Sequence, residues 1–322
     1  MTYWLGCWRR RCLPGVLLVL ALALTGCATQ TRALLQAPST ELPRRTELAT
    51  IPFFAQERYQ CGPAALAMSL RAAGIPATPD ELVPQVYVPQ REGSLPPEML
   101  VAGRRNGALS MTIPPRLDAL LAEIAAGNPV IVLQNLSLQV LPRWHYALVI
   151  GYDLDRGDLI LRSGTTERLT MPLSTFEHTW ARGNYWGMVT LPAGRLPKTV
   201  TEETAVAALA AFERSAGPLR ARQTYEAALR RWSHNLALQL GYGNVLYAAG
   251  DRLAAAAVLR TATAEHPDSA PAFNNLATVL AELGRFDEAR AAAQTAIALG
   301  GPWLDAARAT LASIEAAQKK NR

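Results

Sequence analysis

Positions that recur every 34 residues constrain the last third of this 322-residue chain more than any other feature. The segment is rich in Ala, Leu, Arg and Glu, which favour helices. The pairs that keep this offset are Tyr242/Leu276, Gly243/Ala277, Leu246/Leu280, Gly250/Gly284, Ala255/Ala289, Leu259/Ala293, Ala262/Ala296 and Pro267/Gly301. One period fits two helices joined at a glycine, and such units stack because a single unit cannot bury its apolar face.

This pattern resembles the tetratricopeptide repeat over residues 202–316. Two copies are clear, and a weaker third copy at Ala221, Tyr225 and Ala228 lacks the turn glycine. The resemblance implies an all-α solenoid whose concave groove recruits a substrate or a protein partner and has no chemistry of its own.

The first 27 residues predict an exported lipoprotein. Arg9-Arg10-Arg11 precede the apolar run 16–24, which is too short to span a bilayer. Leu24-Thr25-Gly26-Cys27 resembles a bacterial lipobox, in which the cysteine thiol accepts a diacylglycerol. We therefore expect a signal peptide at 1–26 and a lipid anchor on Cys27; an ordinary signal peptide with a chance cysteine is the alternative. Because no aspartate follows Cys27, the resemblance implies the periplasmic face of the outer membrane.

Residues 27–48 predict a flexible tether, because they are polar, contain Pro38 and Pro43, and show no sustained period. A chain of this length would reach about 25 Å from the membrane.

Charge and motifs argue against several classes of ligand. The formal charge of +6 (32 basic, 26 acidic residues) includes the three arginines of the signal peptide, and no basic block remains without them. We therefore expect no nucleic-acid partner. The chain has neither of the glycine-rich loops that bind nucleotides, and its histidines lack the spacing of metal ligands, so we expect no cofactor and no metal.

Residues 49–193 predict an α+β domain in two lobes, because helical segments come first and short apolar runs follow. The helices are expected over 61–73, 97–106 and 115–126, and the strands over 130–133, 145–152, 158–162 and 168–171. The segment 191–197 interrupts the pattern with two prolines and a glycine and marks the domain boundary.

Cys61 is the one cysteine left free after export, since Cys7 and Cys12 leave with the signal peptide and Cys27 is acylated. A single cysteine in an oxidising compartment is a candidate reactive thiol, whereas a buried structural cysteine is the alternative. Cys61 begins a predicted helix, where free N–H groups and the helix dipole favour the thiolate. Gly62 is expected to let a substrate backbone come close.

His145 is the best candidate for a base among four histidines, because it begins a predicted strand from which its side chain can face a cleft. The alternative for His145 is a hydrogen-bonded edge histidine beside Trp144. We expect His178 in a loop, and His234 and His266 in the repeat region.

Residues 51–56, 61–68 and 145–153, in this order, resemble the double-glycine leader peptidase family. These are papain-like cysteine peptidases known from bacteriocin-processing transporters, with stand-alone secreted relatives. The resemblance covers about residues 50–191 and implies a papain-like two-lobed fold. It implies Cys61 as nucleophile, His145 as general base, and Gln56 as the side chain that stabilises the oxyanion with the Cys61 N–H.

Two positions depart from the family pattern. Gln56 lies five residues before Cys61, where papain-like enzymes usually have six. The acid that usually orients the histidine is replaced by Ser163, so Ser163, Asp153 and Asp155 all remain candidates for that role.

We therefore expect a lipid-anchored cysteine peptidase of the cell envelope, which cleaves a peptide or protein through a Cys61 thioester. One alternative is a non-catalytic envelope adaptor whose peptidase-like domain only binds peptide. A third, weaker hypothesis is a cell-wall peptide hydrolase of another papain-like family.

Overall fold

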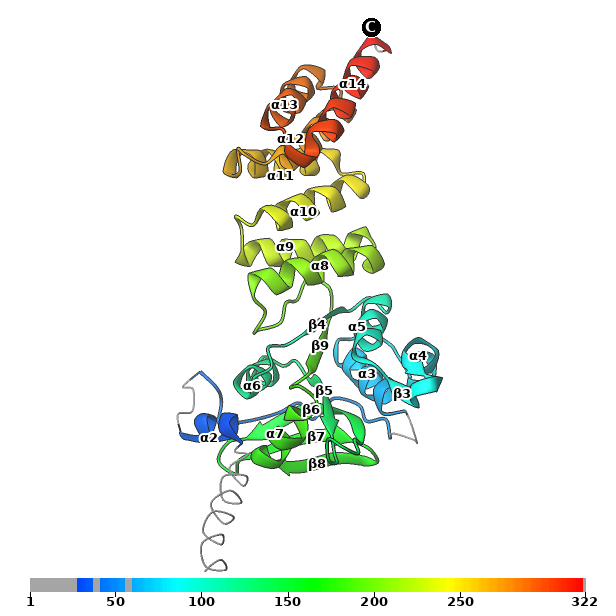
Figure 1. Cartoon of the computed structure of the whole chain (residues 1–322), viewed down its shortest axis with the longest axis vertical. Helices are drawn as coiled ribbons and strands as arrows, with labels where there is room; N and C mark the ends of the chain where they lie inside the picture. The colour runs from blue at the N-terminus through cyan, green and yellow to red at the C-terminus, as the bar shows by residue number, and fades with distance from the viewer. Residues whose placement is uncertain (1–27, 37–40, 56–59, 321–322) are drawn as a thin grey trace, which may run out of the picture.

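A computed structural model of the chain describes residues 28–36, 41–55 and 60–320. An N-terminal sheet-and-helix domain is followed by an all-helical region, which confirms the predicted fold class (Figure 1). Within the described ranges, no helix is long and apolar enough to cross a membrane. The predicted signal peptide, Cys27 and Gln56 lie outside the described residues.

One antiparallel sheet forms the centre of the N-terminal domain, in the order β4-β9-β5-β6-β7-β8, with β1 also paired to β6. Its strands are β1 (Arg45–Glu47), β4 (Leu109–Thr112), β5 (Val130–Asn135), β6 (Trp144–Asp153), β7 (Asp158–Ser163), β8 (Thr166–Pro172) and β9 (Gly187–Leu191). The predicted strands match β5 to β8. The central strands are apolar along most of their length because side chains on both faces of the sheet are buried.

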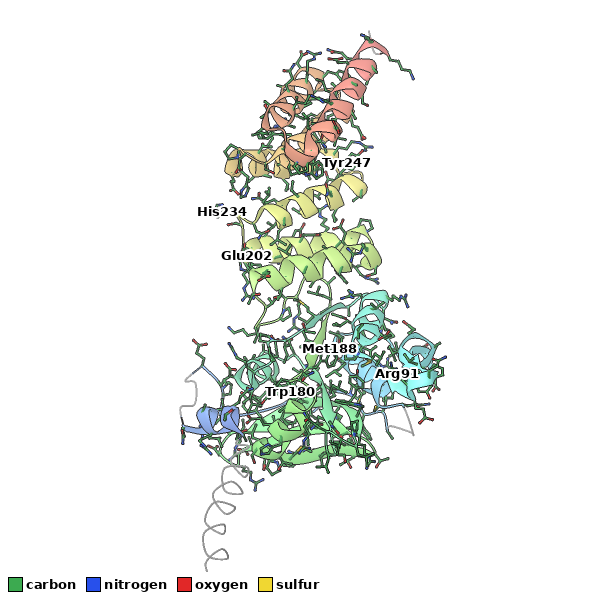
Figure 2. All side chains as sticks on the ribbon, in the orientation of Figure 1. Arg91, Trp180, Met188, Glu202, His234 and Tyr247 are labelled. Carbon is green, nitrogen blue, oxygen red and sulfur yellow. The ribbon has the colours of Figure 1, made fainter. Side chains whose placement is uncertain are left out.

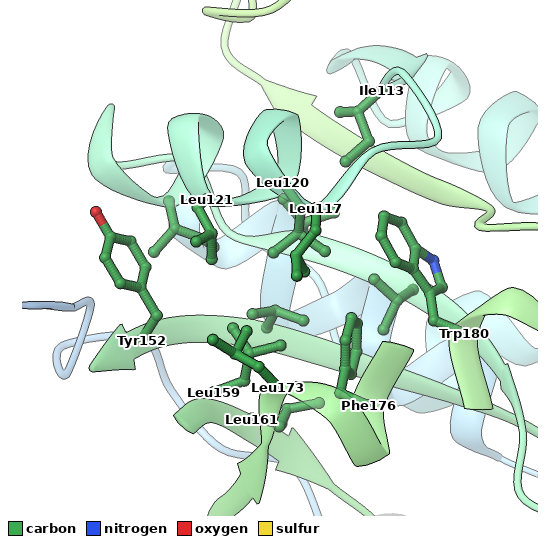
Figure 3. Close-up of a cluster of buried hydrophobic side chains, with 14 of the residues drawn as sticks. Ile113, Leu117, Leu120, Leu121, Tyr152, Leu159, Leu161, Leu173, Phe176 and Trp180 are labelled. Atoms are coloured by element: carbon green, nitrogen blue, oxygen red, sulfur yellow. The ribbon is translucent and has the colours of Figure 1, made fainter. Parts of the chain in front are cut away.

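Helices cover both faces of the sheet. On one face lie α3 (Cys61–Ala72), α4 (Pro79–Val86) and α5 (Pro96–Arg105), with the short hairpin β2 (Tyr87–Val88) and β3 (Gly93–Ser94). On the other face, α6 (Leu117–Ala125) and α7 (Leu173–Ala181) pack together in a second core (Figure 3). The predicted helices match α3, α5 and α6 to within two residues at each end.

His178 lies on α7 and not in the expected loop. Leu173, Phe176 and Trp180 of α7 are buried, at helical spacing. The expectation of a loop at His178 overlooked this helical spacing. The exposed His178 side chain follows from its place on the outer face of α7.

Residues 28–48 differ from the expected flexible tether. Residues 29–36 form α2 (Thr29–Gln36), and β1 pairs with β6. The carboxylate of Glu177 on α7 accepts the N–H groups of Gln30 at 3.0 Å and Thr31 at 2.7 Å. A buried acid from a distant part of the chain thus holds the first turn of α2, a contact that local composition does not reveal.

The helical region contains α8 (Glu202–Ala216), α9 (Pro218–Arg231), α10 (Leu236–Ala248), α11 (Arg252–Glu265), α12 (Ala270–Glu282), α13 (Phe286–Leu299) and α14 (Leu304–Lys320). These helices stack in a column that leads away from the sheet (Figure 1). Asn235 donates to Glu202 at 2.7 Å, and Figure 2 shows Glu202 and His234 on the same side of the column.

Glycines join the helices of each repeat, as the 34-residue period predicts. Gly250 and Gly284 have φ angles of +83° and +72°, which residues with a Cβ rarely adopt. The weaker copy also has a turn glycine, contrary to the prediction: Gly217, with φ +75°, separates α8 from α9 one place away from the 34-residue offset.

The repeats are fixed to the N-terminal domain by packing and by hydrogen bonds. Leu109 and Met111 of β4 share a buried cluster with Leu209 and Phe212 of α8. In the connecting segment, the N–H groups of Lys198 and Thr199 donate to the buried carboxylate of Glu123 at 3.1 and 2.7 Å. Within the boundary segment 191–197, Arg195 donates to Asn128 at 2.9 Å and the Gly194 N–H donates to Thr224 at 3.2 Å, so this connection is not a free linker.

Candidate active site

Cys61 is the first residue of α3, and its thiol is free and partly exposed. Residues 62–70 are all buried, so the core fixes the start of this helix. Burial raises the pKa of the Cys61 thiol, and the backbone groups of Tyr146, Gly62 and Cys61 itself, which lower it, offset the effect only in part. The resting thiol is therefore protonated near neutral pH.

His145 is the second residue of β6, where it pairs with Gln134 of β5. Its Nε2 atom lies 2.9 Å from the Oγ atom of Ser163, the last residue of β7. Burial, with a smaller effect from the positive charge of Arg143, lowers the pKa of His145 to about 4. The imidazole is therefore neutral near pH 7, and in the tautomer in which Nε2 donates to Ser163, Nδ1 is the ring nitrogen that can accept a proton.

Ser163 contacts the imidazole, whereas Asp153 and Asp155 lie elsewhere. Asp153 is eight residues beyond His145 on the same strand, about 26 Å away, and its carboxylate lies 3.1 Å from Arg45. Asp155 accepts a hydrogen bond from Arg44 at 2.7 Å. Of the three candidates for the orienting role, the geometry brings Ser163 to His145.

Cys61 and His145 line one cavity of about 970 Å³. Gly93 and Ser94 of the β2–β3 hairpin also line this cavity, as does Trp144, the residue before His145. The Tyr146 hydroxyl donates to the Ser94 carbonyl at 3.3 Å and so ties this hairpin to β6. The hairpin could not be predicted from the sequence, since two strands of two residues carry no periodicity. Arg91, in its turn, lies at the outer edge of the domain (Figure 2).

Gly62 makes room for the hairpin, which corrects the expected role of this residue. A Cβ atom at Gly62 would lie 2.3 Å from Ser94 Oγ and 2.6 Å from Ser94 Cβ. The space above this glycine is thus filled by the protein's own β3, and not kept open for a substrate backbone.

The close approach at Gly62 predicts a specific pair of variants. Gly62→Ala should lower the free energy of unfolding by about 1–3 kcal/mol, as overpacking of a filled site usually does. Gly62→Ala with Ser94→Gly should recover most of this loss, because both clashing atoms are removed. Urea unfolding of the wild type, Gly62→Ala, Ser94→Gly and the double variant measures the coupling free energy between the two positions. Equal losses in the single and the double variant would mean that Ser94 is not the obstacle.

Burial of neutral His145 predicts a loss of stability in acid. Its pKa falls from 6.5 to about 4 on folding, so the unfolded state binds the extra proton between these values. This contribution to stability is complete above pH 6.5 and is lost as the pH falls towards 4. Between pH 7 and 4.5 the loss should be about 2 kcal/mol. Urea unfolding of the wild type and of His145→Gln at both pH values gives the contribution of His145 as the difference between their losses of unfolding free energy. Equal losses in the two proteins would contradict the prediction.

Comparison with known families decides what this domain is. A model of the Peptidase_C39 like family matches residues 48–187. The N-terminal domain is a peptidase C39-like domain. Models of the tetratricopeptide repeat match residues 206–270, 243–302 and 274–321. Both resemblances stated for the sequence are thus confirmed, and the chain joins a C39-like domain to tetratricopeptide repeats.

Solved structures similar to the chain cover a little under half of it. A putative C39-like peptidase from Bacillus anthracis is 16% identical, with a TM-score of 0.40, over 48% of this chain and 99% of that one. A double glycine motif protease from an AMS/PCAT transporter, in complex with the leader peptide, is 19% identical, with a TM-score of 0.34, over 45% and 93%. The peptidase domain of Streptococcus ComA is 16% identical, with a TM-score of 0.37, over 44% and 98%. No curated protein matches the chain.

The other histidines of the described residues, His178, His234 and His266, do not line the cavity of the C39-like domain. His234 lies 3.1 Å from Glu265, and His266 Nε2 lies 2.9 Å from the His234 carbonyl oxygen, all in the repeats. Across the described ranges, no group of three or more His, Cys, Asp and Glu side chains has the arrangement of a metal site.

Proposed function

We propose that this protein is a cysteine peptidase in which Cys61 is the nucleophile and His145 the general base. One observation carries the proposal: a free thiol and an imidazole held by Ser163 line the same cavity of a C39-like domain. A buried structural cysteine would not face a cavity of this size together with a histidine.

Acylation begins from two neutral groups. As Sγ of Cys61 attacks the carbonyl carbon of the scissile peptide bond, the thiol proton passes to Nδ1 of His145. The Cys61 N–H and, by the family resemblance, Gln56 stabilise the negative charge that develops on the carbonyl oxygen. The imidazolium then gives its proton to the leaving nitrogen, the C–N bond breaks, and the acyl group remains on Cys61 as a thioester.

Deacylation reverses these roles. His145, neutral again, takes a proton from a water molecule as the water attacks the thioester carbonyl carbon. Collapse of the tetrahedral intermediate breaks the C–S bond, returns the proton to sulfur and releases the carboxylic acid. Ser163 holds the ring in one orientation through both steps but carries no charge that would stabilise the imidazolium.

Covalent labelling tests the proposal. A peptide with an electrophilic warhead should label the wild type at Cys61 near pH 7, and Cys61→Ala should remove the label. His145→Ala should slow labelling strongly, since a protonated thiol without a base is a poor nucleophile. Labelling at the same rate in the presence and absence of His145 would mean that the domain binds peptide without activating its thiol, as the adaptor hypothesis requires.

We also propose that Cys27 carries a lipid that attaches the protein to the periplasmic face of the outer membrane. Leu24-Thr25-Gly26-Cys27 after the apolar run 16–24 supports this assignment. Two or more acyl chains on one residue would give stable attachment.

Lipid attachment predicts that Cys27→Ser appears in the soluble fraction or accumulates as the unprocessed precursor. Metabolic labelling with a fatty acid, followed by fractionation at high salt, measures both effects. A Cys27→Ser protein that still carries acyl label and sediments with membranes would exclude Cys27 as the acceptor.

We further propose that the repeats recruit the substrate or a protein partner. The support is their match to the tetratricopeptide repeat and their buried contact with the C39-like domain. A partner held on the column α8–α14 would stay at a constant orientation to the cavity.

A further inference from the structure

The segment that joins β5 to β6 presents apolar side chains to solvent next to the cavity. Val140 is 89% exposed, Leu141 74% and Leu138 65%, and Trp144, which lines the cavity, is 53% exposed. We call Leu136, Leu138, Val140, Leu141 and Trp144 the apolar loop. Within the described part of the chain, it brings together in nine residues five of the large apolar side chains that remain exposed.

Hydrogen bonds beneath the apolar loop hold it in this form. The buried Asn135 side chain accepts the N–H groups of Ser137 at 3.0 Å and Arg143 at 2.9 Å. Arg182, which ends α7, donates to the carbonyl oxygens of Asn135 and Ser137 at 3.3 and 3.1 Å. The loop therefore has an ordered polar base, and its apolar side chains point outward instead of folding onto the domain.

The same helix holds the start of the described chain. Glu177 of α7 binds the first turn of α2, and Arg182 lies five residues further along, about 7.5 Å by helical rise. The 27 residues before Ala28 contain the apolar run 16–24 and Cys27. Helices α2 and α7 lie at the end of the molecule opposite to the C-terminus (Figure 1). The start of the described chain and the base of the apolar loop are thus held at two places five residues apart, at Glu177 of α7 and at Arg182.

We propose that the apolar loop inserts into the surface of the lipid bilayer beside the attachment point, an inference that rests on the proposed membrane attachment. Leu138, Val140 and Leu141 would enter the acyl region, and Trp144 would lie at the level of the headgroups. The positive charge of Arg143 would meet lipid phosphate. The cavity that contains Cys61 and His145 would then open at the membrane surface.

An apolar peptide substrate is the competing occupant of the apolar loop. Arg143 and Trp144 line the cavity, but Leu136, Leu138, Val140 and Leu141 do not. The most exposed side chains therefore extend beyond the cavity wall, where a bound peptide would have to leave the cavity to cover them. A bilayer covers them without that requirement.

A spin label at residue 140 tests the inference. Val140→Cys in a Cys61→Ala background is labelled with a nitroxide, and the processed full chain is bound to vesicles of phosphatidylethanolamine and phosphatidylglycerol. Leu253→Cys on α11, at a leucine that is 72% exposed, is the matched control. Vesicles should raise the collision rate of the residue-140 label with oxygen and lower that with a water-soluble nickel chelate, each severalfold. The label at residue 253 should not change.

Three results separate the alternatives. If the chain floats with the vesicles and the label at residue 140 stays in water, the insertion is wrong and the attachment stands. If the label is buried in vesicles although Cys27 bears no lipid, the insertion stands and the attachment through Cys27 is wrong. If the label stays in water with vesicles but is immobilised by an apolar peptide, the loop is a substrate site and the insertion is wrong. Leu138→Asp with Leu141→Asp, both at exposed positions, should return the label to water without unfolding the chain.

Discussion

Cys61→Ala and His145→Ala are each expected to abolish peptide cleavage, with a loss of at least about a thousandfold in kcat/KM. Ser163→Ala should cost only about tenfold, or ~1.4 kcal/mol, because its hydroxyl orients the ring at 2.9 Å without reacting. The three variants are compared on one peptide. Asp153→Asn and Asp155→Asn are the controls, because both carboxylates are paired with arginines away from the cavity. An unchanged kcat/KM in Ser163→Ala, together with a large loss in Asp153→Asn, would contradict the assignment of Ser163 as the residue that orients His145.

The pH dependence of the same variants separates orientation from charge. The base must be neutral to act, and the pKa of His145 is lowered to about 4, so activity should fall in acid only near that pH. Ser163→Asp should raise the pH at which activity is lost in acid, because a carboxylate stabilises the imidazolium and so raises the pKa of His145. The same variant should match or exceed the rate of the wild type at neutral pH. Ser163→Ala should lower the rate without a comparable rise in the pH at which activity is lost. An equal rise of this pH in Ser163→Ala and Ser163→Asp would mean that the charge of the carboxylate is not its cause.

Removal of all repeats by truncation after Pro192 is expected to prevent folding of the C39-like domain. Leu109 and Met111 would lose the apolar cover supplied by Leu209 and Phe212. Glu123 would lose the N–H groups of Lys198 and Thr199 and remain a buried carboxylate with too few donors. The combined cost should approach the few kcal/mol by which a domain of this size is stable. The measurements are solubility, circular dichroism and labelling of Cys61.

Truncation after Trp232 is the matched control, because it keeps α8, α9 and the connecting segment. This shorter chain should fold and cleave a small peptide at nearly the full rate, while its turnover of a protein substrate recruited by α10–α14 should fall. If truncation after Pro192 gives a folded, active domain, the contact between α8 and β4 does not support the C39-like domain. If truncation after Trp232 also unfolds the chain, the whole column is required for stability.

Local features explain why parts of the site could be predicted from the sequence. Cys61 at the start of a helix, with Pro63 in the first turn, and His145 at the start of a strand are patterns contained in a few neighbouring residues. Ser163 followed from its position on the next strand, and the antiparallel pairing of β6 with β7 brings it to the ring. The strands β5 to β7 were predictable because they are short apolar runs with turn residues beside them, and β8 because its partly buried residues alternate with exposed ones after the turn at Gly164.

Features that depend on distant residues could not be predicted in this way. The first turn of α2 is held by Glu177, and nothing near residue 30 indicates that acid. The β2–β3 hairpin has too few residues for a period, and its place above Gly62 depends on the packing of α3. Pairing of β4 with β9 joins residues about 80 apart, which no local pattern encodes. Tertiary contacts also determine that the repeats are fixed directly to the sheet.

The raised pKa of Cys61 has a consequence for the reactivity of this thiol towards oxidants. Disulfide exchange and oxidation by peroxide both proceed through the thiolate, and a protonated thiol reacts slowly with either oxidant. A lone cysteine that stayed ionised would be converted to a mixed disulfide or a sulfenic acid before many turnovers. In the proposed mechanism Cys61 becomes nucleophilic only when a substrate carbonyl and His145 draw its proton away together, so the resting thiol is expected to resist oxidation between turnovers.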